Sequence, residues 1–188
     1  MKNILLGVTG SIAAYKAAEI ARRFVKQDFS VRVIMTAGAQ RFITPLTFQT
    51  LTKHRVYTDM FDGAFYEDVR HISLAREADI AVIAPATANI IGKLACGIAD
   101  DMLSAVIMAA AGGLTARPVL VCPAMNTAMW ENPVVQGNVC KLKSYGYRFA
   151  GPAESELACG DSGMGALASV DDIVGAALAL LDASGGNG

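Results

Sequence analysis

This sequence has few cysteines, no large excess of either charge, and no long apolar run. The chain of 188 residues holds four widely separated cysteines without a Cys-x-x-Cys pair: Cys96, Cys122, Cys140 and Cys159. This spacing argues against a structural zinc site and against a disulfide framework. We therefore expect reduced thiols, a cytoplasmic location and no metal centre.

Neither nucleic acid nor a membrane is indicated as a partner. Lys and Arg number 16 against 17 Asp and Glu, and the net charge of −1 lacks the basic footprint of a nucleic-acid-binding protein. The longest uncharged stretches contain Gly, Pro, Ser or Thr, and they fall short of the roughly 20 apolar residues that a membrane span requires. The N-terminus enters a strand pattern at once, without a signal-peptide pattern.

Short apolar segments are what the chain has in abundance. Hydrophobic residues make up 53% of it and charged residues 18%, which suits one domain with a large core and a sizeable oligomer interface. Period and turn signals predict strands over 4–8, 31–35, 79–84, 118–122 and 147–150, helices over 12–26, 71–76, 88–95, 101–111, 131–145 and 170–181, helical turns at 39–42 and 47–51, and loops over 59–69 and 151–165.

Strand patterns alternate with helix patterns along the whole chain. This alternation predicts an α/β protein, a single-domain Rossmann-like (flavodoxin-like) parallel sheet with helices on both faces. The sequence shows no internal repeat or linker. We expect one domain over residues 1–183 and a flexible tail over residues 184–188.

Residues 119–130 combine a predicted strand with a candidate ligand-binding residue at its end. Its apolar start has the composition of a buried strand, which Pro123 should end because proline cannot donate a ladder hydrogen bond. Asn126 then follows the strand. In open α/β sheets ligands bind outside the carboxyl ends of the strands, so Asn126 is placed to hydrogen-bond a ligand. The alternative is a loop Asn that caps its own turn.

Hydroxyl side chains follow two other predicted strands. Gly10 and Ser11 come after the first strand and Thr36 after the second, each before a helical segment. Backbone N–H groups and hydroxyls at such a position suit one phosphate group, although Ser11 could be an ordinary helix N-cap. The small residues of Pro85-Ala-Thr-Ala-Asn89, after the next strand, would let a flat ring approach the backbone.

His71 and Cys159 are the candidate groups for acid–base chemistry. His71 starts a predicted helix, a position that disfavours the imidazolium form and keeps the ring available as a base. The alternative is a surface or packing histidine, and His54, beside Lys53 and Arg55, is expected to be solvated surface. Cys159 lies in a Gly-rich polar segment that could close over a ligand, whereas the other three cysteines are expected to be buried and inert.

Six segments together resemble the flavin-dependent cysteine decarboxylases, and within them the phosphopantothenoylcysteine decarboxylases of coenzyme A biosynthesis. The similarity extends over about residues 2–181. The Ala-Cys-Gly-Asp segment is typical of the coenzyme A branch, because the peptide-modifying relatives generally lack that cysteine. The six segments are 10–16 (GSIAAYK), 71–72 (HI), 85–89 (PATAN), 97–101 (GIADD), 123–126 (PAMN) and 158–161 (ACGD).

The resemblance implies FMN as the cofactor. Ser11 and Thr36 would bind its phosphate, and the segment after the 79–84 strand would line its ring. The residues that the resemblance assigns to FMN are Gly10, Ser11, Thr36, Pro85, Ala86, Thr87, Ala88 and Ala124.

The resemblance also implies a substrate, 4′-phosphopantothenoylcysteine, and a reaction. The substrate would be oxidised transiently to a thioaldehyde, lose CO₂ and be reduced again to 4′-phosphopantetheine. His71 would be the base or positioner in the oxidative step, and Cys159 would donate the final proton. The substrate would contact Asn126, through its carboxylate, and Met125, Ala158 and Gly160.

A homo-oligomer is implied as well, a trimer or a multiple of trimers with FMN near the subunit boundary. Many bacterial relatives continue into a synthetase domain, so a separate phosphopantothenate–cysteine ligase is a further candidate partner. Alternative functions are decarboxylation of a peptide C-terminal cysteine, which Cys159 argues against, and a non-catalytic flavin-binding regulatory subunit, which should lack His71 or Cys159. A flavin prenyltransferase should lack the Pro-Ala-Met-Asn pattern.

Overall fold

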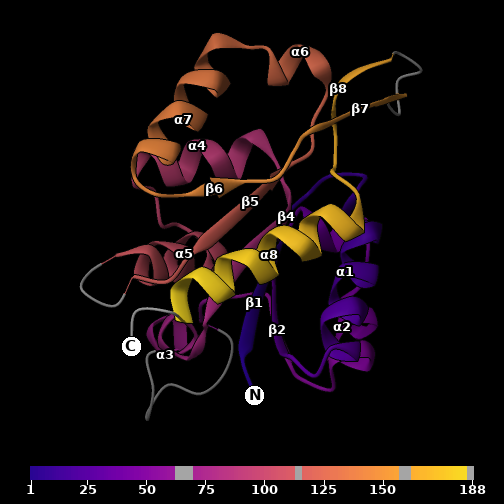
Figure 1. Cartoon of the computed structure of the whole chain (residues 1–188), viewed down its shortest axis with the longest axis vertical. Helices are drawn as coiled ribbons and strands as arrows, with labels where there is room; N and C mark the ends of the chain where they lie inside the picture. Colours follow the sequence, from indigo (N-terminus) through magenta and orange to yellow (C-terminus); the bar gives the residue numbers. More distant parts are fainter. Residues whose placement is uncertain (62–69, 113–115, 157–161, 186–188) are drawn as a thin grey trace.

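The computed structural model describes residues 1–61, 70–112, 116–156 and 162–185 (Figure 1). Its main sheet is parallel throughout, in the order β3-β2-β1-β4-β5-β6. The strands are β1 (Asn3–Val8), β2 (Ser30–Met35), β3 (Val56–Tyr57), β4 (Ile80–Ala86), β5 (Val119–Pro123) and β6 (Arg148–Phe149). The predicted α/β class with a parallel sheet is confirmed.

The strand order reverses between β1 and β4, the two central strands. Without the two-residue edge strand β3, the other five strands follow the flavodoxin order 2-1-3-4-5. At such a switch point the loops after neighbouring strands leave toward opposite faces of the sheet. A crevice therefore opens at the carboxyl ends of β1 and β4.

Helices cover both faces of the sheet, as predicted. The helical segments are α1 (Ala14–Lys26), the 3-10 turn η1 (Ala39–Arg41), α2 (Pro45–Thr52), α3 (Arg70–Glu77), α4 (Ala88–Cys96), α5 (Met102–Ala111), α6 (Thr127–Trp130), α7 (Pro133–Ser144) and α8 (Val170–Gly185). One core lies between the sheet and α1, α2 and α8, and the other between the sheet and α3, α4, α5 and α7.

Successive strand residues alternate between these two cores. In β1, Ile4 and Leu6 face the α1 side and Leu5 faces the α5 side; all three are buried. Strand side chains alternate with period two, so a strand covered on both faces is apolar at every position. Each such side chain contributes about 1.5–3 kcal/mol on burial, which is why the apolar runs of the sequence mark the central strands well.

The largest departure from prediction is the segment 151–165, which we expected to be a loop. Most of it forms an antiparallel pair of strands, β7 (Ala153–Glu156) and β8 (Ser162–Ala166), separate from the main sheet. Figure 1 shows the pair beside α6. The prediction was wrong because glycine-rich strands lack the apolar alternation that identifies a strand, and β8 is stabilised by docking on a distant segment, where Met125 N donates to Gly165 O at 2.9 Å.

The ends of several helices also differ from the prediction. The helix expected over 131–145 is preceded by the single turn α6 and begins at Pro133, because the Asn132 side chain accepts from Val134 N at 2.9 Å and caps it. Helix α8 continues to Gly185, so residues 184 and 185 of the expected tail are helical. Residues 186–188, and residues 62–69 of the predicted loop, lie outside the described residues.

Two of the three cysteines that we expected to be buried are exposed. Cys122 in β5 is fully buried, and burial raises the pKa of its thiol far above the usual range. Cys96 and Cys140 are exposed because they lie on the solvent faces of α4 and α7. His54 is half-buried rather than solvated. Within the described ranges, no helix is long and apolar enough to cross a membrane.

Candidate functional site

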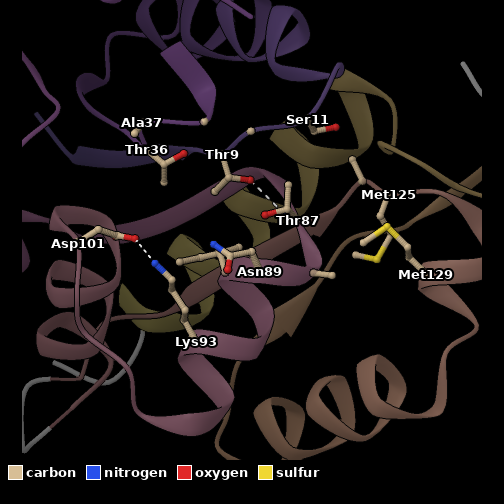
Figure 2. Close-up of a pocket in the computed structure, with 15 residues that line it drawn as sticks. Thr9, Ser11, Thr36, Ala37, Thr87, Asn89, Lys93, Asp101, Met125 and Met129 are labelled. Atoms are coloured by element: carbon tan, nitrogen blue, oxygen red, sulfur yellow. Dashed lines mark hydrogen bonds and ion pairs between the residues drawn. The ribbon is translucent and has the colours of Figure 1, made fainter. Parts of the chain in front are cut away.

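A pocket of about 580 Å³ lies at the carboxyl ends of β1, β2, β4 and β5 (Figure 2). Its volume falls within the range of roughly 300–1,000 Å³ that is usual for small-molecule sites. Six residues that the sequence assigned to FMN line it: Gly10, Ser11, Thr36, Thr87, Ala88 and Ala124. Met125, assigned to the substrate, lines it too.

The loops after β1 and β2 form one wall, and they touch through backbone atoms. A Cβ on Gly10 would lie 3.0 Å from the Cα and carbonyl carbon of Gly38. Ser11 Oγ accepts from Ala13 N at 3.3 Å and Thr36 Oγ1 accepts from Ala39 N at 3.2 Å. Ser11 therefore does stabilise its own turn, as the alternative interpretation held. A hydroxyl that accepts a hydrogen bond still has its O–H to donate, so both hydroxyls can also serve a phosphate.

Thr9 connects the ends of β1 and β4. It is buried, its Oγ1 donates to Pro85 O at 2.7 Å, and the same oxygen accepts from Thr87 N at 3.1 Å. This pair of bonds holds the start of α4 beside the β1 loop. Thr9 was not predicted from the sequence, although a hydroxyl at the end of a buried strand was a usable signal.

The opposite wall comes from α4, α5 and the segment after β5. Asn89 and Lys93, four residues apart, lie on the same face of α4, and Met125 and Met129 form the part of this wall that follows β5 (Figure 2). Pro85 and Ala86 are buried within β4 and do not line the pocket. Their backbone oxygens accept hydrogen bonds from Thr9 and Ala124, so they support the wall from behind.

An ion pair forms part of this wall. Lys93 Nζ lies 2.7 Å from Asp101 Oδ2 and 2.7 Å from Asp100 Oδ1. Burial lowers the pKa of Lys93, but its hydrogen bonds to the two carboxylates outweigh burial and raise the pKa overall. Burial raises the pKa of Asp101, and hydrogen bonds from Lys93 and Ser104 outweigh it, so that this pKa is lowered. Both groups therefore stay charged near neutral pH.

Asn126 caps α6 rather than lining the pocket. Its Oδ1 accepts from Ala128 N at 2.9 Å, and the residue is exposed, so the capping alternative is realised in the structure. Next to it, the β7–β8 pair fits against the chain without spare room. A Cβ on Gly165 would lie 2.2 Å from Met125 O, and a Cβ on Gly163 would lie 2.5 Å from Thr127 Oγ1.

Of the remaining predicted site residues, only His71 is among the described residues, and it does not join this pocket. His71 is the second residue of α3, is partly exposed, and does not line it. Figure 1 shows α3 at the opposite end of the molecule from α6. Ala158, Cys159 and Gly160 lie outside the described residues.

Several lining residues had no assigned role at the level of sequence. They are Thr9, Ala37, Gly38, Asn89, Ile90, Lys93, Asp101 and Met129. The spacing of Asn89 and Lys93 on one helical face was visible, but which face turns toward the strand ends was not. Asp101 reaches the pocket only because α5 starts beside α4.

The composition of the pocket fits a flavin mononucleotide. Hydroxyls and closely approaching backbone on the β1 and β2 side suit a phosphate, small residues after β4 leave room for a flat ring, and Met125 and Met129 give an apolar side. A parallel α/β protein with such a pocket at its topological switch point is a nucleotide-binding protein of the Rossmann-like class.

Comparison with known proteins identifies the family within that class. A family model described as Flavoprotein matches residues 1–182, and the chain belongs to this family. The coenzyme A biosynthesis bifunctional protein CoaBC of Bacillus subtilis is 47% identical over 173 residues, which are 92% of this chain and 41% of that protein. The chain thus spans less than half the length of this relative. A probable phosphopantothenoylcysteine decarboxylase of Streptococcus mutans is 45% identical over 173 residues, 92% of this chain and 95% of that one.

Two solved structures share the fold over nearly the whole chain. A cysteine-to-serine mutant of PPC decarboxylase, complexed with pantothenoylaminoethenethiol, has a TM-score of 0.87 at 32% identity and covers 96% of this chain and 98% of its own. The FMN-dependent cysteine decarboxylase SpaF has a TM-score of 0.81 at 32% identity and covers 97% of this chain and 98% of its own.

Proposed function

We propose that this protein is an FMN-dependent carboxy-lyase that converts 4′-phosphopantothenoylcysteine to 4′-phosphopantetheine in coenzyme A biosynthesis. The observation that carries the proposal is the pocket in which Ser11, Thr36, Thr87, Ala88 and Ala124 converge from four strand ends. Relatives named for this decarboxylation support the assignment of the substrate, and one of them is matched over 95% of its own length by this chain.

The pocket residues divide the binding of FMN between them. Ser11 and Thr36, with the backbone beside Gly10, hold the phosphate, and Thr87, Ala88 and Ala124 line the ring. Pro85 and Ala86 act as support, through their position in β4. When bound, FMN supplies an acceptor and later a donor of two electrons. The protein orients the substrate and excludes water.

Asn126 and Met125 bind the substrate at the mouth of the pocket. The Asn126 amide holds the carboxylate that leaves as CO₂, and its capping bond to Ala128 N keeps the side chain oriented while it does so. Ala158 and Gly160 contact the substrate from the neighbouring segment, and Cys159 donates the last proton. The complex of a cysteine-to-serine mutant with an enethiol supports this role for Cys159.

His71 acts as the base or positioner from a neighbouring subunit. It does not line the pocket of its own chain, so a homo-oligomer, a trimer or a multiple of trimers, is needed to bring it there. Head-to-tail contacts in a closed ring place different surfaces of two subunits together. We further propose a cytoplasmic location and a phosphopantothenate–cysteine ligase as a partner, since the bifunctional relative continues well beyond the matched segment.

Mixed oligomers test whether His71 and Asn126 act from different subunits. Oligomers of His71→Asn alone or of Asn126→Asp alone should be inactive. Equal mixing of the two should restore about a quarter of the wild-type sites if each site takes one residue from each subunit. Mixed oligomers that remain inactive would contradict the shared site.

Spectra and turnover test the assignment as a whole. The purified protein should show the flavin absorption band, release FMN on denaturation, and evolve CO₂ from 4′-phosphopantothenoylcysteine. Peptides that end in cysteine should be turned over poorly, and efficient turnover of such peptides would favour the peptide-modifying function instead. A protein that binds NAD or FAD instead, or no cofactor after reconstitution, would overturn the proposal.

Cys159→Ser separates the two halves of the reaction. Serine is a far poorer proton donor than a thiol with a pKa of about 8.5, so the variant should release CO₂ once and stop at an enethiol product with the flavin reduced. An anaerobic single-turnover absorbance trace with mass analysis of the product measures this. Ordinary 4′-phosphopantetheine formed at the wild-type rate would rule out Cys159 as the donor.

A further inference from the structure

Lys93 and Asp101 are the only charged residues among those that line the pocket in the described part of the chain. They lie on the same wall as Asn89, one helical turn from Lys93 (Figure 2). Charged pairs removed from water are costly unless they are well hydrogen-bonded. A neutral Asn or Ser would cap α5 equally well. The position of this charged pair on the pocket wall therefore indicates a role beyond capping α5.

Hydrogen bonds within the protein occupy some, but not all, of the donors of Lys93 and the acceptor positions of Asp101. An ammonium has three N–H donors, and Lys93 directs two of them to Asp100 and Asp101. A carboxylate has about four acceptor positions, and within the described residues Asp101 fills three, with Lys93 Nζ, Ser104 N and Ser104 Oγ. One donor and one acceptor remain.

Asn89 adds an amide to this set. Within the described ranges its side chain makes no hydrogen bond, and it is exposed toward the pocket. An amide offers both an acceptor oxygen and an NH₂ donor. The wall thus presents a donor, an acceptor and a group of either kind next to one another.

We propose that Lys93, Asp101 and Asn89 bind the pyrimidine edge of the flavin ring. That edge presents C=O, N–H and C=O in a row, an acceptor–donor–acceptor pattern, which the remaining donor, acceptor and amide of this wall complement. The inference rests on the proposed function, because it concerns the orientation of the same FMN. It assigns the ring edge to the α4–α5 wall and leaves the phosphate to the loops after β1 and β2.

The charges of the pair also affect the reduction of the ring. Reduction adds electron density to the pyrimidine edge, and nearby positive charge favours the reduced form while negative charge disfavours it. Without Lys93, the Asp101 carboxylate on the wall and the Asp100 carboxylate beside it both lose their ion-pair partner. Without the charge of Asp101, the ammonium is shared with Asp100 alone. Lys93 and Asp101 should therefore act on the ring in opposite directions.

The test uses Lys93→Met and Asp101→Asn, with Arg23→Met as the control. Asn preserves the α5 cap, and Arg23 is in an ion pair with Asp171 that lies away from the pocket. Dissociation constants for FMN and for riboflavin, which lacks the phosphate, are measured by fluorescence quenching, and midpoint potentials by equilibration with redox dyes.

Lys93→Met should weaken FMN and riboflavin by the same factor, about tenfold, because the lost contact is to the ring. It should also shift the ratio of reduced to oxidised flavin about tenfold toward the oxidised form, a change of about 30 mV for two electrons. Asp101→Asn should shift the potential the opposite way, and Arg23→Met should shift nothing. Lys93→Gln, which keeps a donor without the charge, should retain most of the affinity and lose the potential effect, and it replaces the Met variant if that one does not fold.

Two results would overturn the inference. Loss of FMN affinity without loss of riboflavin affinity would mean that Lys93 serves the phosphate. Potentials and affinities equal to those of the control would mean that the pair only joins α4 to α5. Failure of the proposed function would differ from both, because the unaltered protein would then bind neither FMN nor riboflavin.

Discussion

The two walls of the pocket are built in different ways. The wall after β1 and β2 consists of glycines and short hydroxyl residues whose hydrogen bonds are local: Ser11 to Ala13, Thr36 to Ala39. The wall after β4 and β5 adds long side chains to its small residues and depends on contacts between distant segments, such as Lys93 with Asp101 and Met125 with Gly165. A wall of backbone groups suits a part shared by many ligands, the phosphate. A wall of side chains suits the parts that differ, the ring and the substrate.

The largest effect is expected at a residue that belongs to neither wall. Changing His71 to Asn should reduce decarboxylation by about 10²–10⁴-fold, the usual contribution of a general base, while FMN stays bound because the pocket is unaltered. The flavin content of the purified variant and its rate of CO₂ release give the two numbers. If flavin were lost together with activity, the region around His71 would have to contribute to FMN binding in addition to the two walls.

The first wall is tested at Thr36. Its change to Val removes a hydroxyl that we propose donates to the FMN phosphate, and a hydrogen bond to a charged group is worth about 1.5–3 kcal/mol. FMN affinity should fall by roughly one to two orders of magnitude, whereas riboflavin affinity should stay nearly the same. Thr36→Ser keeps the hydroxyl and is the control. Equal losses for both flavins would mean that Thr36 shapes the ring site instead.

The second wall is tested at Gly165, where a Cβ would lie 2.2 Å from Met125 O. Gly165→Ala forces the β7–β8 pair away from the Met125–Asn126 segment, and overpacking of this kind costs about 1–3 kcal/mol. We expect weaker substrate turnover with FMN affinity retained, and a lower midpoint of urea unfolding.

Gly175→Ala is the matched control for this change. Gly175 lies in α8, and outside its own helix backbone no atom of the described residues lies within 4 Å of its Cβ position. Alanine there should raise the free energy of unfolding by about 0.4–1 kcal/mol. If Gly165→Ala resembled Gly175→Ala in turnover, the close fit of β8 would not matter for the substrate side.

The smallest effect concerns acid stability of the second wall. The pKa of Asp101 is lowered in the fold, so its contribution to stability is fully present above the unfolded value of about 3.9 and is lost as the pH falls through the lower, folded value. Urea unfolding from pH 5 to pH 3 should show a shallower loss of stability for Asp101→Asn than for the unaltered protein. Parallel curves would indicate that the ion pair contributes nothing in this range.

Sequence reasoning worked where the structural signal was local. Buried parallel strands are apolar at each position, so the strand beginning at Ile4 and its neighbours were predicted within a residue or two. Gly10, Ser11 and Thr36 could be assigned to one site because parallel strands end at the same edge of the sheet. The β7–β8 pair was missed because its stability comes from docking Gly163 and Gly165 on residues that are distant in the sequence.

The amino-acid sequence by itself determined the α/β class, the central strands and the segments that follow three of these strands at one edge of the sheet: Gly10-Ser11, Thr36 and residues 85–89. These features depend on side-chain periodicity and on chain direction. Only the tertiary structure decided that Lys93 and Asp101 share a wall, that Asn126 caps α6, and that His71 lies away from the pocket of its own chain. These facts depend on how helices rotate and where loops return. Helix rotation and loop return are set by the packing of whole elements, which no local residue pattern encodes.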